Sequence, residues 1–175
     1  LIIADSSQDH LLLLNDANGD GAYLDDSEIS IIYNDSSDVP LSVPAAMLQR
    51  DEDLLLLDGG SLDTLLSLRD TNKDGFLSGI DEITSLYDGG NSVPDWVYPT
   101  SLCRGPAAES ISEGETLYVA DRSTTRRRVL RLHDTDGDGL FHTPGECQVW
   151  WSANTTTGTD PLLLPTAITP LGNES

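Results

Sequence analysis

Three short stretches of this sequence place oxygen-bearing side chains at alternate positions of a tight loop. Each has Asp at loop position 1, Asp or Asn at position 3, Asp at position 5, Gly at position 6 and Glu at position 13. Alternating oxygen donors on a sharply bent loop can surround one cation, and glycine at position 6 permits the bend. Because these positions hold no Cys or His, the pattern favours a hard cation, and calcium fits best.

Each predicted calcium site uses the side chains at positions 1, 3, 5 and 13 and the backbone carbonyl at position 7. In chain order, these residues are Asp16, Asn18, Asp20, Ala22 and Glu28; Asp70, Asn72, Asp74, Phe76 and Glu82; and Asp134, Asp136, Asp138, Leu140 and Glu146. The alternative is a set of Asp/Asn/Gly surface turns that bind no ion. Since the pattern recurs three times in register, we predict three calcium sites.

The residues that flank each loop predict strands. In helix–loop–helix calcium sites the closing Glu lies at position 12, one residue earlier than here. A five-residue apolar run, partly β-branched or aromatic, lies on each side of every loop and is too short for a typical helix. The runs before the loops are 10–14, 64–68 and 128–132, and those after them are 29–33, 83–87 and 147–151. We therefore expect a strand, a calcium loop and a second strand.

The loops belong to a larger unit that occurs three times. From Asp16 to Asp70 and from Asp70 to Asp134 the intervals are 54 and 64 residues. The chain also contains three apolar strands that end in Asp (1–5, 54–58, 117–121) and three Pro-headed strands (44–48, 99–103, 165–169). Four short strands per repeat are typical of a propeller blade. We predict an all-β fold of four-stranded antiparallel units in one domain, 1–175, with approximate units 1–43, 44–98 and 99–164.

The two ends of the chain match each other. The first unit lacks a Pro-headed strand, and residues 165–175 provide one. We therefore expect 165–175 to contact Leu1–Asp5 in the same copy or a neighbouring copy. Propellers have about four to eight blades, and open sheet edges pair with other chains. The expected partner is another copy of the chain, in a homo-oligomeric ring or a homopolymeric filament, unless a longer parent polypeptide carries identical repeats.

The segments Leu117-Tyr-Val-Ala-Asp121, Arg128-Val-Leu-Arg-Leu132 and Asp134-Thr-Asp-Gly-Asp-Gly139 resemble blades of secreted bacterial β-propellers. The resemblance is to the class that includes sugar-dehydrogenase-like and six-bladed lactonase-like propellers, and it extends at motif level over nearly the whole chain. It implies a propeller fold. The quinone-binding and catalytic residues of the dehydrogenases have no identifiable counterpart here, so the resemblance implies fold rather than activity.

Composition narrows the possible partners. The net charge of −21 argues against nucleic acid and anionic membranes. Three calcium ions would add six positive charges and change −21 to −15, which is still strongly acidic. No stretch approaches the ~20 apolar residues of a membrane span. The chain begins at Leu1 without a signal peptide, and we expect a mature, secreted product or an excised piece.

Two further features concern an extracellular location. Cys103 and Cys147 are an even pair, which favours a disulfide outside the cell, but the unit places them on its first and last strands, which are not neighbours. The sequence therefore leaves this bond open. Glycosylation sequons begin at Asn34, Asn154 and Asn173, where glycans and chance sequons are equally plausible.

Two classes of function are compatible with these patterns. The first is an extracellular structural or adhesive repeat module, not an enzyme, in which calcium stabilises the fold. The alternative is a fragment of a propeller enzyme, such as a quinone-dependent sugar dehydrogenase or a lactonase. Metal loops placed at strand-to-strand turns favour the first class.

Overall fold

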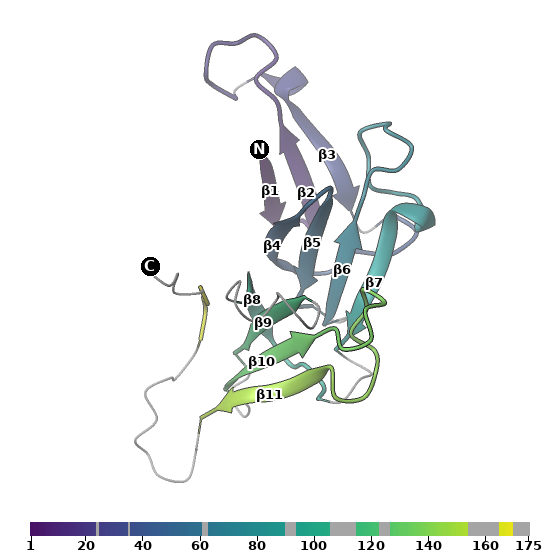
Figure 1. The fold of residues 1–175 in the computed structure, drawn as a ribbon. Coiled ribbons are helices and arrows are strands. Elements are labelled where there is room, and N and C mark those ends of the chain that lie inside the picture. Colours follow the sequence, from purple (N-terminus) through teal and green to yellow (C-terminus); the bar gives the residue numbers. More distant parts are fainter. Residues whose placement is uncertain are drawn as a thin grey trace, which may run out of the picture.

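In the computed structural model, the described residues are 1–23, 25–34, 36–60, 63–89, 94–105, 115–122, 127–153 and 165–169. Within these ranges the regular secondary structure consists of eleven strands and two single-turn 3-10 helices (Figure 1). The predicted all-β class is confirmed. Among the described residues, no helix has the length and hydrophobicity needed to cross a membrane.

The strands form three antiparallel sheets in which each strand pairs with its neighbours in the sequence. Sheet 1 contains β1 (Ile2–Asp5), β2 (His10–Leu14) and β3 (Ile29–Asn34). Sheet 2 contains β4 (Pro44–Arg50), β5 (Asp53–Asp58), β6 (Thr64–Leu68) and β7 (Ile83–Asp88). Sheet 3 contains β8 (Pro99–Arg104), β9 (Thr116–Asp121), β10 (Arg128–His133) and β11 (Cys147–Ser152). The helices η1 (Asp26–Glu28) and η2 (Ile80–Glu82) immediately precede β3 and β7.

The sheets lie face to face, with sheet 2 between the other two (Figure 1). Successive residues of a strand point to opposite faces, so the leucine run of β5 supplies both interfaces. Leu56 packs in the core between sheets 1 and 2, whereas Leu55 and Leu57 pack in the core between sheets 2 and 3. An uninterrupted apolar run is therefore the pattern of a strand that is buried on both faces.

Each sheet has a β-bulge at the same place in its last strand pair. In sheet 1, Leu12 pairs with Ile31 and Leu11 pairs with Tyr33, which leaves Ile32 as the extra residue. The same shift in register leaves Leu86 as the extra residue of sheet 2 and Trp150 as that of sheet 3. A bulge changes the direction in which its residue points, and here it recurs in all three units.

The expected Pro-headed strand at 165–169 is not formed within a single copy. This segment has no strand conformation. Thr100 Oγ1 donates a hydrogen bond to the Pro165 carbonyl at 3.0 Å, and the Ile168 N–H donates to Ser101 Oγ at 3.1 Å. These bonds use side chains of β8, so they do not form the backbone ladder that defines a strand. Within one copy the segment therefore lies against β8, while contact with Leu1–Asp5 of a neighbouring copy remains a prediction. Residues 170–175 lie outside the described part.

The cysteines and the sequons can be placed in this frame. Cys103 and Cys147 are free, buried thiols on β8 and β11, and burial raises the pKa of each. They belong to different apolar clusters of sheet 3, which lie on its two opposite faces. Asn34 ends β3, and its side-chain carbonyl accepts hydrogen bonds from the Ser36 N–H and hydroxyl. Asn154 and Asn173 lie outside the described residues.

Candidate metal centres

The three loops close in the same way at their base. The residue before position 1 donates its backbone N–H to the carbonyl of the Glu at position 13. The pairs are Asn15 to Glu28 at 2.9 Å, Arg69 to Glu82 at 2.9 Å and His133 to Glu146 at 2.8 Å. Each loop is therefore an ordered connection between the second and third strand of sheet 1, or between the third and fourth strand of sheets 2 and 3.

The carboxylate at position 1 holds the bend of every loop. It accepts the N–H of the glycine at position 6 at 3.0 Å in all three copies. The pairs are Gly21 to Asp16, Gly75 to Asp70 and Gly139 to Asp134. The three glycines have φ values of +79°, +86° and +81°, a region that favours glycine because it has no Cβ. The glycine of the sequence motif is thus explained by a backbone conformation.

Positions 3 and 5 are oriented by the same kind of hydrogen bond. The side chain at position 3 accepts the N–H of position 5 at 2.7–3.2 Å. The Asp at position 5 accepts the N–H of position 7 at 2.7–2.8 Å. These bonds fix the peptide units of Ala22, Phe76 and Leu140. Their carbonyls as calcium ligands remain a prediction.

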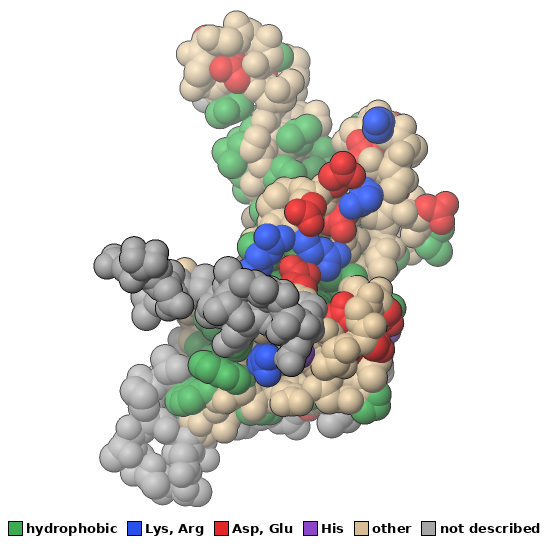
Figure 2. All heavy atoms as spheres, viewed as in Figure 1, with side chains coloured by type: hydrophobic (Ala, Val, Ile, Leu, Met, Phe, Trp, Pro, Cys, Tyr) green, Lys and Arg blue, Asp and Glu red, His purple; other side chains and the backbone are tan. Residues whose placement is uncertain are grey.

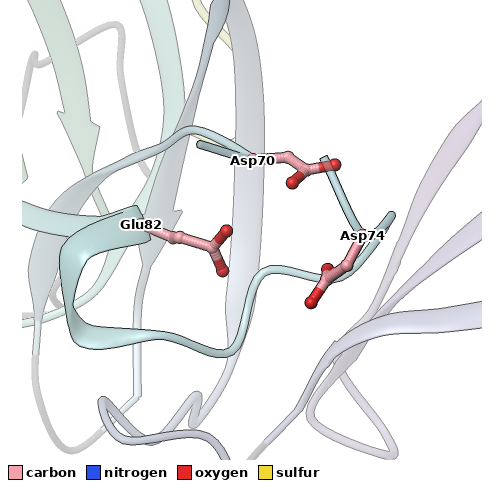
Figure 3. A group of neighbouring side chains, drawn as sticks. All are labelled: Asp70, Asp74 and Glu82. Carbon is pink, nitrogen blue, oxygen red and sulfur yellow. The ribbon is translucent and has the colours of Figure 1, made fainter. Parts of the chain in front are cut away.

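The second and third loops each bring three carboxylates together. In the second loop, oxygens of Asp70, Asp74 and Glu82 lie within 4.8 Å of one another and point into the same loop (Figure 3). In the third loop the group is Asp134, Asp136 and Asp138, again within 4.8 Å. Either cluster could hold a metal ion. Like charges at this separation repel one another, and a divalent cation would offset that repulsion.

The first loop is less closely gathered. Its described side chains form no group of three acidic residues within the same distance. The Asn18 side-chain amide instead donates to Asp25 Oδ2 at 3.2 Å. The backbone frame from Asp16 to Ala22 nevertheless matches the other two loops. We infer that this loop has the same backbone fold with less preorganised side chains.

The Glu at position 13 has a structural role that the sequence motif did not indicate. Glu28, Glu82 and Glu146 are all buried. In the third loop, one oxygen of Glu146 accepts the Thr135 N–H at 2.9 Å and the other accepts the Thr143 N–H at 2.9 Å. These bonds join the two limbs of the loop through the N–H groups at positions 2 and 10. Glu82 accepts from the same two positions, and Glu28 accepts from positions 3 and 10. Of the three, Glu82 alone also belongs to one of the two described acidic groups.

One carboxylate oxygen in the second loop is buried without a hydrogen-bond partner. Asp70 Oδ1 is buried and makes no hydrogen bond. A buried, unpaired polar atom costs free energy, and for a charged group the cost is larger. A cation bound among Asp70, Asp74 and Glu82 would satisfy this oxygen. The donor set and this atom both fit a hard metal ion.

Sequence reasoning missed the residue at loop position 8. The Leu77 N–H donates to the carbonyl of Ile32, the bulge residue of sheet 1, at 2.7 Å. The Phe141 N–H makes the same bond to Leu86, the bulge residue of sheet 2, at 2.9 Å. Leu77 and Phe141 are 7% and 1% exposed. The signal was a large apolar side chain at position 8 of every loop, including Tyr23 in the first.

A second acidic region lies among other parts of sheets 2 and 3. Buried Asp58 accepts the N–H groups of Ser42 and Val43, and buried Asp121 pairs with Arg128 at 2.9 Å. Burial, together with the charges of Asp121 and Asp58, raises the pKa of Asp63 to about 6. Asp58 accepts backbone N–H groups from the segment before β4, and Asp121 accepts the Tyr98 N–H from the segment before β8, so both carboxylates have a structural role.

Comparison with models of known protein families and with curated protein sequences finds no match to this chain. The resemblance to propeller blades therefore remains an expectation. The metal interpretation depends on the loop geometry and on the chemistry of the donor atoms.

Proposed function

We propose that this protein is an extracellular calcium-binding structural or adhesive repeat module, in which calcium holds the loops in place. The observation that carries the proposal is the pair of three-carboxylate groups in the second and third loops, each within 4.8 Å. Both sit in the same hydrogen-bonded frame, and the first loop shares that frame. Such repetition favours ion binding over incidental surface turns.

The donor atoms support calcium as the ion. The proposed ligands are carboxylate, amide and backbone carbonyl oxygens, which suit hard cations. Calcium accepts a variable number of such oxygens, whereas magnesium requires near-ideal octahedral geometry. Millimolar affinities are typical of extracellular calcium modules, and the strongly acidic, lysine-poor composition suits that setting. We propose three sites, of which the first binds most weakly because its side chains are less gathered.

The position of the loops indicates how an ion would stabilise the stack of sheets. In the second loop, the carboxylates at positions 1, 5 and 13 flank Leu77 in the sequence, and the Leu77 N–H is hydrogen-bonded to sheet 1. Phe141 links the third loop to sheet 2 in the same manner. An ion that orders either loop also orders the contact with the preceding sheet. This arrangement supports a structural role for calcium over a catalytic one.

The open ends of the stack support self-association. Two of the three sheets have the four-stranded antiparallel order of a propeller blade, and the first has three strands. We propose that copies associate through their end sheets into a ring or a filament with propeller-type packing.

Calcium binding and thermal melting test the proposal together. We expect an elemental assay to find three calcium ions per chain after dialysis against calcium. At a concentration one hundredfold above the dissociation constant, each site adds ~2.7 kcal/mol to the free energy of unfolding. Chelation should therefore lower the melting temperature by many degrees. Equal melting temperatures with calcium and chelator, or a protein without bound calcium, would contradict the structural role of the ion.

A further inference from the structure

The two end sheets of the stack carry apolar faces that repeat the buried interfaces inside it. We define the leading face of sheet 1 by residues that point away from sheet 2, namely Ile3, Leu12, Leu14, Tyr23, Ile29 and Ile31. We define the trailing face of sheet 3 by residues that point away from sheet 2, namely Tyr118, Val129, Trp150 and Trp151. Hydrophobic side chains exposed over sheet 1 are visible in Figure 2.

The leading face is equivalent to surfaces that are buried in the other sheets. The sheet 2 residue equivalent to Ile31 is Ser85, which is exposed. The other five positions of the leading face have equivalents in sheet 2 that face sheet 1, and each is at most 7% exposed. They are Leu56, Leu66, Leu68, Leu77 and Ile83. In sheet 1, Ile3, Tyr23, Ile29 and Ile31 are between 38% and 45% exposed. Side chains that pack against a preceding sheet in two units are thus apolar but uncovered in the first.

On the trailing face, Tyr118 and Val129 are already buried and pack with Ile168, so Trp150 and half-buried Trp151 supply the accessible apolar surface. Ile32 and Tyr33 of sheet 1 pack against sheet 2, and Leu86 and Tyr87 of sheet 2 pack in the core shared with sheet 3. The equivalent residues of sheet 3 are Trp150 and Trp151. Trp150 is 62% exposed, and its ring lies 5.2 Å from that of Tyr118 in an edge-to-face arrangement. An aromatic pair of this kind provides a large apolar contact area.

The hydrogen bond between a loop and the preceding sheet forms twice within the chain, and its donor and acceptor positions also occur, unpaired with each other, on the two end sheets. The position-8 N–H of a calcium loop donates to the bulge carbonyl of the preceding sheet, at 2.7 Å for Leu77 and 2.9 Å for Phe141. Tyr23 occupies position 8 of the first loop, and Trp150 is the bulge residue of the last sheet. Tyr23 of one copy and Trp150 of another therefore occupy the positions that would donate and accept the same bond.

The first strand of sheet 3 lies beside the first strand of sheet 2. β8 contacts β4, the first strand of the preceding sheet. Residues 165–169 lie against β8 in turn, and Ile168 packs with Cys103, Tyr118 and Val129. This segment therefore occupies the place next to β8 at which the first strand of a fourth sheet would begin. Sheet 1 is the sheet that lacks such a strand.

We propose that a second copy of this chain docks head to tail, with its leading face on the trailing face of the first. Tyr23 of the incoming copy packs beside Trp150, and its N–H donates to the Trp150 carbonyl. β1 of the incoming copy pairs with 165–169, which becomes the fourth strand of that sheet. This inference rests on the proposed function, because calcium bound in the first loop would order Tyr23 and so promote docking.

Light scattering and sedimentation across a range of protein concentrations, in millimolar calcium, test this docking. Wild-type protein should form dimers or longer chains. Ile29→Glu on the leading face and Trp150→Glu on the trailing face should each give monomers. Thr84→Glu, which adds the same charge at an exposed site of β7, should assemble as the wild type does. Ile3→Glu provides a second leading-face variant if Ile29→Glu melts at a markedly lower temperature.

Mixing the two monomeric variants gives the decisive result. Each retains one intact face, so a head-to-tail contact predicts one-to-one heterodimers that do not extend further. A wild-type monomer with saturated calcium sites, or a mixture that remains monomeric, would overturn the docking inference. Calcium content measured on the same samples separates the two proposals. Assembly without bound calcium contradicts the structural role of the ion, whereas bound calcium in a permanent monomer contradicts the docking.

Discussion

Replacing Asp138 by Asn should change stability in opposite directions with and without calcium. Asp138 Oδ1 accepts the Leu140 N–H at 2.8 Å, and the amide oxygen of Asn can accept the same bond. The turn is therefore retained, while one negative charge is lost from the group that Asp138 forms with Asp134 and Asp136. The substitution separates the role of the side chain in the turn from its role toward an ion.

The sizes of the two effects follow from simple electrostatics and linkage. Two charges at this separation in water repel by about 1 kcal/mol, so the calcium-free variant should gain about 1–2 kcal/mol from two relieved pairs. With calcium one hundredfold above the dissociation constant, loss of the site costs up to ~2.7 kcal/mol. For a chain of this length, 1 kcal/mol shifts the melting temperature by roughly 2–4 °C. In calcium the lost ~2.7 kcal/mol is partly offset by the relieved repulsion of about 1–2 kcal/mol, so the melting temperature should fall by about 1–7 °C. In chelator the melting temperature should rise by a few degrees.

Differential scanning calorimetry of wild type and Asp138→Asn in both buffers provides the assay. Asp38→Asn is the matched control, because Asp38 is exposed and lies outside the loops, and its effect should be small in either buffer. An equal loss of stability in calcium and in chelator would refute the reasoning, since it would mean that Asp138 acts through the turn alone.

Two further substitutions test the backbone and the charges. Lys73, at loop position 4, has φ +62°, whereas the third loop has Gly137 at this position with φ +78°. A side chain is strained in this left-handed conformation, so Lys73→Gly should raise the free energy of unfolding, measured by urea titration, by about 1 kcal/mol. An unchanged or lower value would show that Lys73 is not strained. The pKa of Asp63 is raised to about 6 by burial and by the charges of Asp121 and Asp58, so wild-type stability should fall as pH rises through about 6. The amide side chain introduced by Asp63→Asn cannot ionise, so this variant should be more stable than wild type above pH 6. The difference in the free energy of unfolding, measured by urea titration in chelator, should disappear near pH 4. A difference that stays constant from pH 4 to above pH 6 would exclude the ionisation of Asp63 as its cause.

The strands were predictable because their apolar runs and boundaries are local properties. The run Leu54–Leu57, for example, ends at Asp58 in both the sequence pattern and β5. The relation between units was not local. The hydrogen bond from Leu77 to Ile32 spans two sheets, and its recognition requires knowledge that the bulge residue and loop position 8 face each other. Residues 165–169 form no strand in the single copy, because a strand needs a backbone partner as well as a suitable sequence.

In the candidate site, the motif predicted which residues face the loop but not how they are satisfied. Asp70 and Asp74 lie together as expected. The buried Glu146 accepts backbone N–H groups from both limbs of its loop, an arrangement that depends on the three-dimensional path of the chain. The number and spacing of oxygen-bearing side chains therefore indicate that a loop suits a hard cation, but they do not indicate the role of each side chain.

The position of sheet 2 between the other sheets has a consequence for folding. Leu55 and Leu56 are fully buried on opposite faces of one strand, so sheet 2 loses part of its core if either neighbour detaches. In stacked repeats, stability is approximately a sum of unit and interface terms, and the units with one neighbour open first. Hydrogen exchange should therefore proceed inward from β1–β3 and from β8–β11, and the amides of β5 and β6 should be the last to exchange.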